Sequence, residues 1–138
     1  YRPVEPETIS NTYEEIRMEL NKFQNSHGAF SIGIDEWGYS SKESTQISLS
    51  LDQQANYLAR MYFLNEMNNI LFTNIYEWRN SGTNIYEREH NFGLITNSGE
   101  PKPAFYKLKN LLIKFLFYVE LHLPNFLLLY YQLMFSSV

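Results

Sequence analysis

The chain has 138 residues, 44% of them hydrophobic, 19% charged and 17% aromatic, with a formal net charge of −4 at pH 7. This length suits one domain with a hydrophobic core, and the composition argues against an intrinsically disordered protein. The absence of a basic run argues against a nucleic-acid-binding protein, and the absence of cysteine excludes a disulfide scaffold and a Cys-ligated zinc site. The many aromatic residues are compatible either with a stacking surface for carbohydrate or with an aromatic core.

The N-terminal third predicts a helix followed by a strand. In residues 6–25 the apolar positions recur at spacings that form one helical face: Ile9, Tyr13, Ile16, Leu20 and Phe23. Polar residues and a glycine at 25–28 end this helix. Residues 29–36 then alternate apolar and polar side chains, which is typical of a strand.

A second helix is expected to begin at Ser50, where Gln53 completes the pattern of a capping box. Its predicted buried face comprises Leu51, Ala55, Leu58, Ala59, Tyr62 and Phe63. Residues 70–78 are mostly apolar and predict the second strand. The third helix is expected to start near Pro101 and Pro103, with a buried stripe formed by Ala104, Leu108, Leu111 and Phe115.

This order of helix and strand predicts parallel strands joined by crossover helices, which is an α/β fold. The predicted loops that follow the strands, at 37–49 and 79–100, are long and polar, whereas those that precede the strands are short. Such asymmetry is typical of a (β/α)8 barrel with its site at the carboxyl ends of the strands, and it equally suits an open doubly wound sheet. Because a complete barrel takes about 250 residues, two strands imply an incomplete barrel, and we expect a truncated product.

The sequence from 111 onward is almost entirely apolar, and we divide the chain into a partial catalytic barrel at 1–112 and a tail at 113–138. A membrane span takes about 20 apolar residues, but ionisable and helix-breaking residues fall inside this tail: Glu120, His122 and Pro124. The alternatives are a helix that continues to about residue 123 and breaks at Pro124, a membrane anchor, or sequence added by an error in the gene assignment.

The stretch IGIDEWGYSS at 32–41 is the most informative part of the chain. A strand that ends in two acids, an aromatic residue and a glycine places a carboxylate at the mouth of a sheet. Strict alternation would put Glu36 on the same face as Ile32 and Ile34, with Asp35 on the other face. From the residues alone, Glu36 is either a catalytic carboxylate or a solvated acid at the end of a strand.

This stretch resembles the seventh-strand motif of clan A glycoside hydrolases, in which a Glu followed by an aromatic residue and Gly is the nucleophile. Further segments resemble these enzymes in the same order, and the similarity is greatest to glycoside hydrolase family thirty-nine: YRP with Pro6 and Glu7, QA with Leu58 and Arg60, YEWRNSG at 76–82, EHNFGL at 89–94 and PKPA at 101–104. The resemblance covers about residues 1–112 and implies a retaining β-glycosidase that cleaves poly- or oligosaccharides. A secreted or extracellular location would be in keeping with such an enzyme.

The resemblance assigns Glu36 as nucleophile and Trp78 as an aromatic floor of the sugar subsite, with a tryptophan in the core as the alternative for Trp78. Trp37 and Tyr39 flank the nucleophile and are expected to contact the sugar or to pack beside it. His90 lies in the loop that resembles the family and could approach the site. These are the predicted substrate-binding residues, and no metal or other cofactor is expected.

Retaining glycosidases need two carboxyl groups about 5–5.5 Å apart. The family's acid/base Glu lies on the fourth strand, which would precede Tyr1, and we reject Glu77 and Glu89 for that role. The isolated chain is therefore expected to be inactive, with carbohydrate as its partner in the longer enzyme. The competing hypothesis is a non-catalytic barrel remnant, or an interaction protein that associates with a membrane through its tail.

Overall fold

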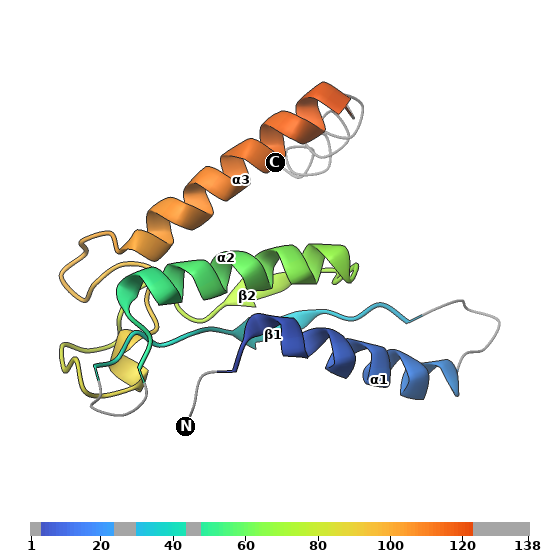
Figure 1. Cartoon of the computed structure of the whole chain (residues 1–138), viewed down its shortest axis with the longest axis horizontal. Coiled ribbons are helices and arrows are strands. Elements are labelled where there is room, and N and C mark those ends of the chain that lie inside the picture. Colours follow the sequence, from blue (N-terminus) through green and yellow to red (C-terminus); the bar gives the residue numbers. More distant parts are fainter. Residues whose placement is uncertain (1–3, 24–29, 44–47, 123–138) are drawn as a thin grey trace, which may run out of the picture.

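The structure, a computed structural model, describes residues 4–23, 30–43 and 48–122, with side chains described as far as residue 116. Its helices and strands follow in the order η1 (Pro6–Thr8), α1 (Ile9–Asn21), β1 (Ile34–Trp37), α2 (Leu51–Met67), β2 (Thr73–Ile75), η2 (Glu89–Asn91) and α3 (Pro103–His122). The two strands form a parallel sheet, order β1-β2. The alternation of helix and strand predicted from the sequence is confirmed, as is the parallel pairing (Figure 1).

The first helix is shorter and less buried than its apolar spacing predicts. It starts with a 3-10 turn at Pro6, and the α-helix ends at Asn21. Of the expected face only Tyr13 is buried, while Ile16 is 39% exposed and Phe23 is 71% exposed. The described contacts of α1 explain this, since it touches η1 and meets α2 through polar pairs near the end of that helix.

The second helix begins as predicted. The Ser50 hydroxyl accepts a hydrogen bond from the Gln53 backbone N–H, and the Gln53 side chain accepts one from the Ser50 N–H. These two bonds satisfy donors that a helix start would otherwise leave unpaired. Most of its inner face is buried, but Leu51 and Phe63, which were predicted to be buried, are 46% and 51% exposed. The residues of α2 that are buried are Gln54, Ala55, Leu58, Ala59, Met61 and Asn65.

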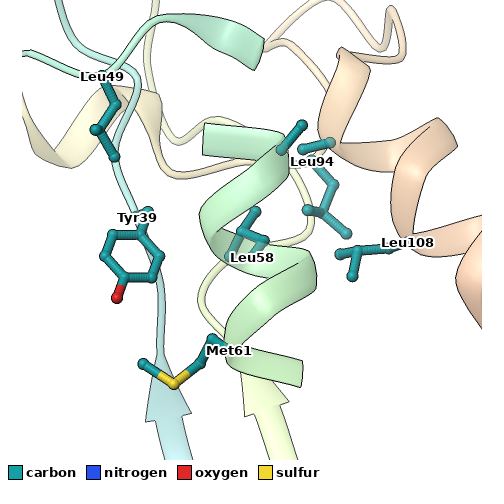
Figure 2. Close-up of a cluster of buried hydrophobic side chains, with 8 residues drawn as sticks. Tyr39, Leu49, Leu58, Met61, Leu94 and Leu108 are labelled. Atoms are coloured by element: carbon teal, nitrogen blue, oxygen red, sulfur yellow. The ribbon is translucent and has the colours of Figure 1, made fainter. Parts of the chain in front are cut away.

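The hydrophobic core lies between α2, the start of α3 and the loops that follow the strands (Figure 2). Its buried members are Tyr39, Leu49, Ala55, Leu58, Met61, Leu94, Ala104 and Leu108. Leu58 and Ala104 are both fully buried, where α2 and α3 pack together. The core therefore joins the second and third helices, and the strands are attached to it through Trp37 and Ile75.

The third helix leaves the body of the molecule at an angle to α2 (Figure 1). Ala104 and Leu108 in its first turns are buried, whereas four apolar residues beyond them are exposed: Leu112, Ile113, Phe115 and Leu116. Within the described residues, no helix is long and apolar enough to cross a membrane. The helix continues to His122, as one alternative for the tail expected, while residues 123–138, with Pro124, lie outside the described part of the chain.

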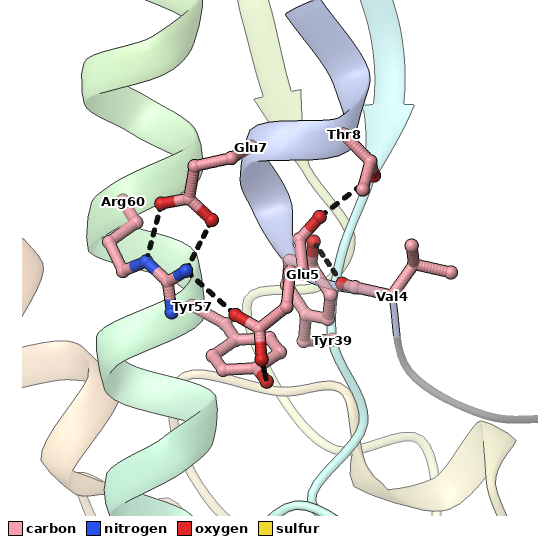
Figure 3. A network of polar contacts seen from close by, with 7 residues as sticks. All are labelled: Val4, Glu5, Glu7, Thr8, Tyr39, Tyr57 and Arg60. Atoms are coloured by element: carbon pink, nitrogen blue, oxygen red, sulfur yellow. Dashed lines mark hydrogen bonds and ion pairs between the residues drawn. The ribbon is translucent and has the colours of Figure 1, made fainter.

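An exposed polar network attaches the N-terminal segment to α2 (Figure 3). The Arg60 guanidinium pairs with the carboxylates of both Glu5 and Glu7, and the Tyr57 hydroxyl donates to Glu5. The bond from Tyr57, followed by that from Arg60, lowers the pKa of Glu5, and Arg60 lowers the pKa of Glu7. Because such solvent-exposed pairs contribute little each, the network fixes the direction of the segment more than it adds stability.

The capping box gives a direct test of local stability. Replacing Ser50 by Ala removes the acceptor for the Gln53 N–H and should lower the free energy of unfolding by about 1 kcal/mol. Ser48→Ala, at an exposed position two residues earlier, is the matched control and should change it by less than about 0.5 kcal/mol. Thermal unfolding followed by circular dichroism measures both, and equal effects would show that the cap does not hold α2.

Candidate functional site

The candidate site lies at the carboxyl ends of β1 and β2, where the chain enters its two long polar loops. In parallel α/β sheets this edge is where ligands bind, because the loops there are free to vary while the strands hold their ends in place. Glu36 is the third residue of β1, and its side chain is exposed.

One face of the sheet is turned towards the helices. Trp37 and Ile75 pack against the core, and the Thr73 hydroxyl accepts a hydrogen bond from the Asn65 amide of α2 at 2.9 Å. The same hydroxyl accepts a bond from the Trp37 indole N–H, while the Tyr13 hydroxyl of α1 donates to the Asn65 oxygen at 2.7 Å. Four elements are thus joined by one chain of hydrogen bonds, which holds the end of β1 in place.

A register shift in the sheet decides where the two acids point. Ile34 pairs with Thr73 and Trp37 pairs with Ile75, so three steps along β1 match two steps along β2. Such a bulge breaks strict alternation. The burial along β1 agrees, because Ile34 and Trp37 are half-buried while Asp35 and Glu36 between them are both exposed. Alternation therefore does not separate Glu36 from Asp35, contrary to the expectation from parity.

The end of β2 lies directly against the end of β1. The Tyr76 N–H donates to the Trp37 carbonyl at 2.7 Å, and a Cβ placed on Gly38 would lie 1.9 Å from the Tyr76 carbonyl oxygen. Only glycine fits at position 38, which gives a physical reason for the glycine that follows the acids and the aromatic residue.

Tyr76 directly follows β2, and its backbone is bonded to the end of β1. The negative charges of Glu77, and to a smaller extent Glu89 and Glu36, raise the pKa of its phenol, to which partial burial also contributes. Its ring packs edge-on against Phe92, with ring centroids 5.3 Å apart. Tyr76 was not among the residues predicted to contact a sugar, and the bond from its backbone N–H to the Trp37 carbonyl places it at the end of β1.

The Trp78 side chain packs against the first turns of α3. Its ring packs edge-on against Phe105 at 5.8 Å between centroids, and it is 60% exposed. Phe105 in turn packs edge-on against Tyr106, so three aromatic rings follow one another on this surface. The described contacts of Trp78 are with this surface and with the backbone of Leu94 and Ile95, rather than with Glu36.

The structure also fixes the positions of the other predicted substrate-binding residues. Tyr39 is only 7% exposed, its hydroxyl donates to the Val4 carbonyl at 3.2 Å, and its ring meets Tyr57 edge-on. The His90 Nδ1 atom accepts a bond from the Asn84 N–H at 3.3 Å. Trp37 is half-buried in the hydrogen-bond chain described above. Among these residues, Tyr39 is thus part of the core and His90 supports the loop that carries it.

The two long loops meet at the backbone carbonyl of Asn91. This oxygen accepts from the Ser41 N–H and hydroxyl at 3.1 and 3.2 Å, from the Gln54 amide at 3.2 Å and from the Lys102 ammonium at 3.1 Å. Gln54 also donates to the carbonyls of Tyr39 and Phe92. A single carbonyl therefore joins the loop after β1, helix α2, the loop after β2 and the start of α3.

Two acidic residues that follow β2 have partners in the same loop. Glu89 lies 3.7 Å from the Arg88 guanidinium. Glu77 accepts a bond from the Ser81 N–H at 3.1 Å. In the part of the chain that the structure describes, no group of three or more His, Asp or Glu side chains could hold a metal ion.

Comparison with known proteins finds a similarity at the level of solved structures. No family model matches the chain, and no curated protein matches it. A solved family 39 glycoside hydrolase from the gut symbiont Bacteroides cellulosilyticus WH2 superimposes with a TM-score of 0.57 and 26% sequence identity. The match covers 67% of this chain and 18% of that enzyme. The chain is thus similar in structure to part of a family 39 glycoside hydrolase.

Lys102 makes the stability of this region depend on pH. The side chain is 4% exposed, and its burial lowers the pKa of the ammonium group to about 8 from 10.5. Between these two values the unfolded chain binds more protons than the folded chain, so this group makes stability rise with pH from about 8 to about 10.5. The gain should be no more than about 3 kcal/mol.

The measurement is urea unfolding across this pH range for the wild-type chain, for Lys102→Met and for Lys109→Met, the latter an exposed lysine on α3, which begins directly after Lys102. The difference between wild type and Lys102→Met should grow in favour of the wild type as pH rises, because only the wild type loses its buried charge. Lys109→Met should follow the wild type. A constant difference for Lys102→Met would mean that the lysine does not titrate in the fold.

Proposed function

We propose that this chain forms part of the catalytic (β/α)8 barrel of a retaining β-glycoside hydrolase, with Glu36 as the nucleophile. The single observation that carries the proposal is an exposed carboxylate at the carboxyl end of a parallel strand, in a fold similar to part of a family 39 glycoside hydrolase. In this arrangement β1 and β2 are the last two strands of the barrel, and α3 is its last helix.

The surroundings of Glu36 suit a nucleophile. Its side chain is exposed and is not part of the core, so a sugar can approach it without displacing core residues. The strand end that carries it is held by the Trp37 indole on one side and by the Tyr76 backbone on the other. Such fixed positioning matters because a small displacement of a reacting group from its productive geometry is costly in rate.

The reaction proceeds in two displacements. First, a Glu36 carboxylate oxygen bonds to the anomeric carbon as the bond from that carbon to the leaving oxygen breaks, and the leaving oxygen takes a proton from a carboxylic acid. A water molecule then attacks the same carbon, the ester to Glu36 breaks, and the proton of the water returns to the carboxylate that had acted as acid. The configuration at the anomeric carbon is retained because it is inverted twice.

We assign no residue of this chain as the carboxylic acid that protonates the leaving oxygen. Glu77 is engaged by the Ser81 N–H, and Glu89 lies beside Arg88, so neither stands free to face a leaving group held by Glu36. We accordingly propose that the isolated chain is inactive towards ordinary glycosides. We propose that Tyr76, Trp37, Trp78 and His90 contact the sugar. Tyr39 is excluded from this set because its ring is buried in the core.

A chimaera tests the assignment of the nucleophile. This chain replaces the matching segment of the family 39 enzyme, so that the host supplies the other strands. A 2-fluoro glycoside with an activated leaving group should attach to Glu36, because the fluorine slows breakdown of the glycosyl ester. Glu36→Gln should lower turnover at least about a thousandfold, which corresponds to about 4 kcal/mol in the barrier.

Asp35→Asn is the matched control, since the neighbouring acid is equally exposed and should keep turnover within the same order of magnitude. Mass spectrometry of peptides locates the label. A label on another residue, or a folded Glu36→Gln chimaera that retains turnover, would refute Glu36 as nucleophile. A chimaera that binds oligosaccharide without turnover, whatever the residue at 36, would favour a non-catalytic carbohydrate-binding remnant.

A further inference from the structure

Helices α2 and α3 are in contact near their starts and diverge towards their ends (Figure 1). Near the starts, the Lys107 ammonium of α3 donates a hydrogen bond to the Asn56 side-chain oxygen of α2. Leu58 and Ala104 are fully buried in the same region, where the two helices pack together. The contact between the helices is therefore closed at the end where both begin.

The faces that make this contact continue along both helices as apolar surface. Residues three, four or seven positions apart lie on one face of a helix, so Phe63 shares the α2 face of Asn56 and Ala59. On α3, Phe115 follows the buried Leu108 in the same way. Phe63 is nevertheless 51% exposed and Phe115 is 42% exposed. The facing sides of the two helices are thus apolar and uncovered where the helices diverge.

We call the exposed apolar side chains of this region the divergent surface: Phe63 and Met67 of α2, with Leu112, Phe115 and Leu116 of α3. Removing apolar surface from water stabilises a protein by roughly 25 cal/mol per Å². Soluble proteins rarely leave large contiguous apolar patches exposed, and those that they do expose commonly bind another group. The divergent surface is therefore expected to be covered.

The sequence that follows α3 supplies an apolar segment beside this surface. Helix α3 ends at His122, and nine of the ten residues at 126–135, FLLLYYQLMF, are hydrophobic. The sequence 123–138 contains no charged residue, so its composition is not that of a solvated tail. Pro124 cannot continue α3 regularly, because proline lacks a backbone N–H and its ring clashes with the preceding turn.

The length of this segment suits the divergent surface. From His122 back to Leu112 is about 15 Å along α3, at 1.5 Å for each helical residue. Ten residues span this distance even as a helix, and extended residues span more. Because the segment is joined to the end of α3, its effective concentration at the surface is of millimolar order. Covalent attachment therefore favours this segment over a second copy of the chain.

We propose that residues 126–135 of the chain fold back and dock on the divergent surface between α2 and α3. The proposal concerns the C-terminal segment and is independent of Glu36 and of any glycosidase activity. Its consequence is that the segment is a functional part of this fold, which keeps the divergent surface from binding a second copy or a lipid surface.

The test uses the full 138-residue chain, which contains no cysteine, so that introduced thiols have no competitors. Phe63→Cys combined with Leu129→Cys should form a disulfide within one chain under mild oxidation. The matched control combines Leu129→Cys with Met18→Cys, since Met18 is 59% exposed but lies on α1, on the other side of α2 from α3 (Figure 1). The first pair should close at least about tenfold faster, as about 1.4 kcal/mol of preference would give. In concentrated urea the two rates should come within a few-fold of each other, because loop closure depends only weakly on loop length.

Two further substitutions separate docking from general proximity. Leu127→Asp, added to the Phe63 and Leu129 cysteine pair, should bring its closure rate close to that of the control pair, because a buried charge opposes docking. Gln132→Asp, at the polar position of the same segment, should leave the rate unchanged.

Equal closure rates of the two cysteine pairs in native buffer would overturn the proposal. Disulfides that form between chains, with a dimer in light scattering of the wild-type chain, would show that a second copy covers the divergent surface instead. Sedimentation of the wild-type chain with phosphatidylcholine vesicles would favour a lipid surface, and would equally contradict the intramolecular contact.

Discussion

The backbone carbonyl of Asn91 is the contact on which the arrangement of the loops depends. Donors from Ser41, Gln54 and Lys102 reach this one oxygen from three different segments of the chain. Gln54 and Lys102 are 0% and 4% exposed, so each of these polar groups is removed from water, and losing a partner there costs more than an exposed hydrogen bond would. The core packs around this junction, and the loops after both strands are consequently fixed to each other before any ligand binds.

A chain of hydrogen bonds holds the two strands in place against the helices, as the Asn91 carbonyl holds the two loops together. It runs from Tyr13 through Asn65 and Thr73 to the Trp37 indole, and every link joins residues distant in sequence or on different elements. Because Trp37 is fixed towards the helices by this chain, the residue before it is turned away from them. The bulge adds one residue to β1, and both acids become exposed together.

Local patterns in the sequence predicted what local physics controls. The start of α2 at Ser50 is confirmed because capping needs only residues three positions apart, and the parallel sheet is confirmed because crossover helices leave few alternatives. The face of Glu36 and the surroundings of Trp78 could not be read in the same way. The first depends on a bulge set by Trp37 and Thr73, and the second on packing against Phe105, which follows 27 positions later in the chain. Tertiary contacts of this kind leave no periodic signal.

The two junctions also explain why the helices are buried so unevenly. Residues of α2 take part in both junctions, through Gln54 near its start and Asn65 near its end, and this helix supplies three of the eight buried residues of the core, more than any other helix or strand. Helices α1 and α3 are each attached at one end of α2, so their distal apolar residues, such as Met18 and Leu116, stay exposed. Among the described elements, α2 is the one that both junctions share. The exposed Glu36 at the end of β1 therefore depends on this helix for its position, through Asn65, Thr73 and Trp37.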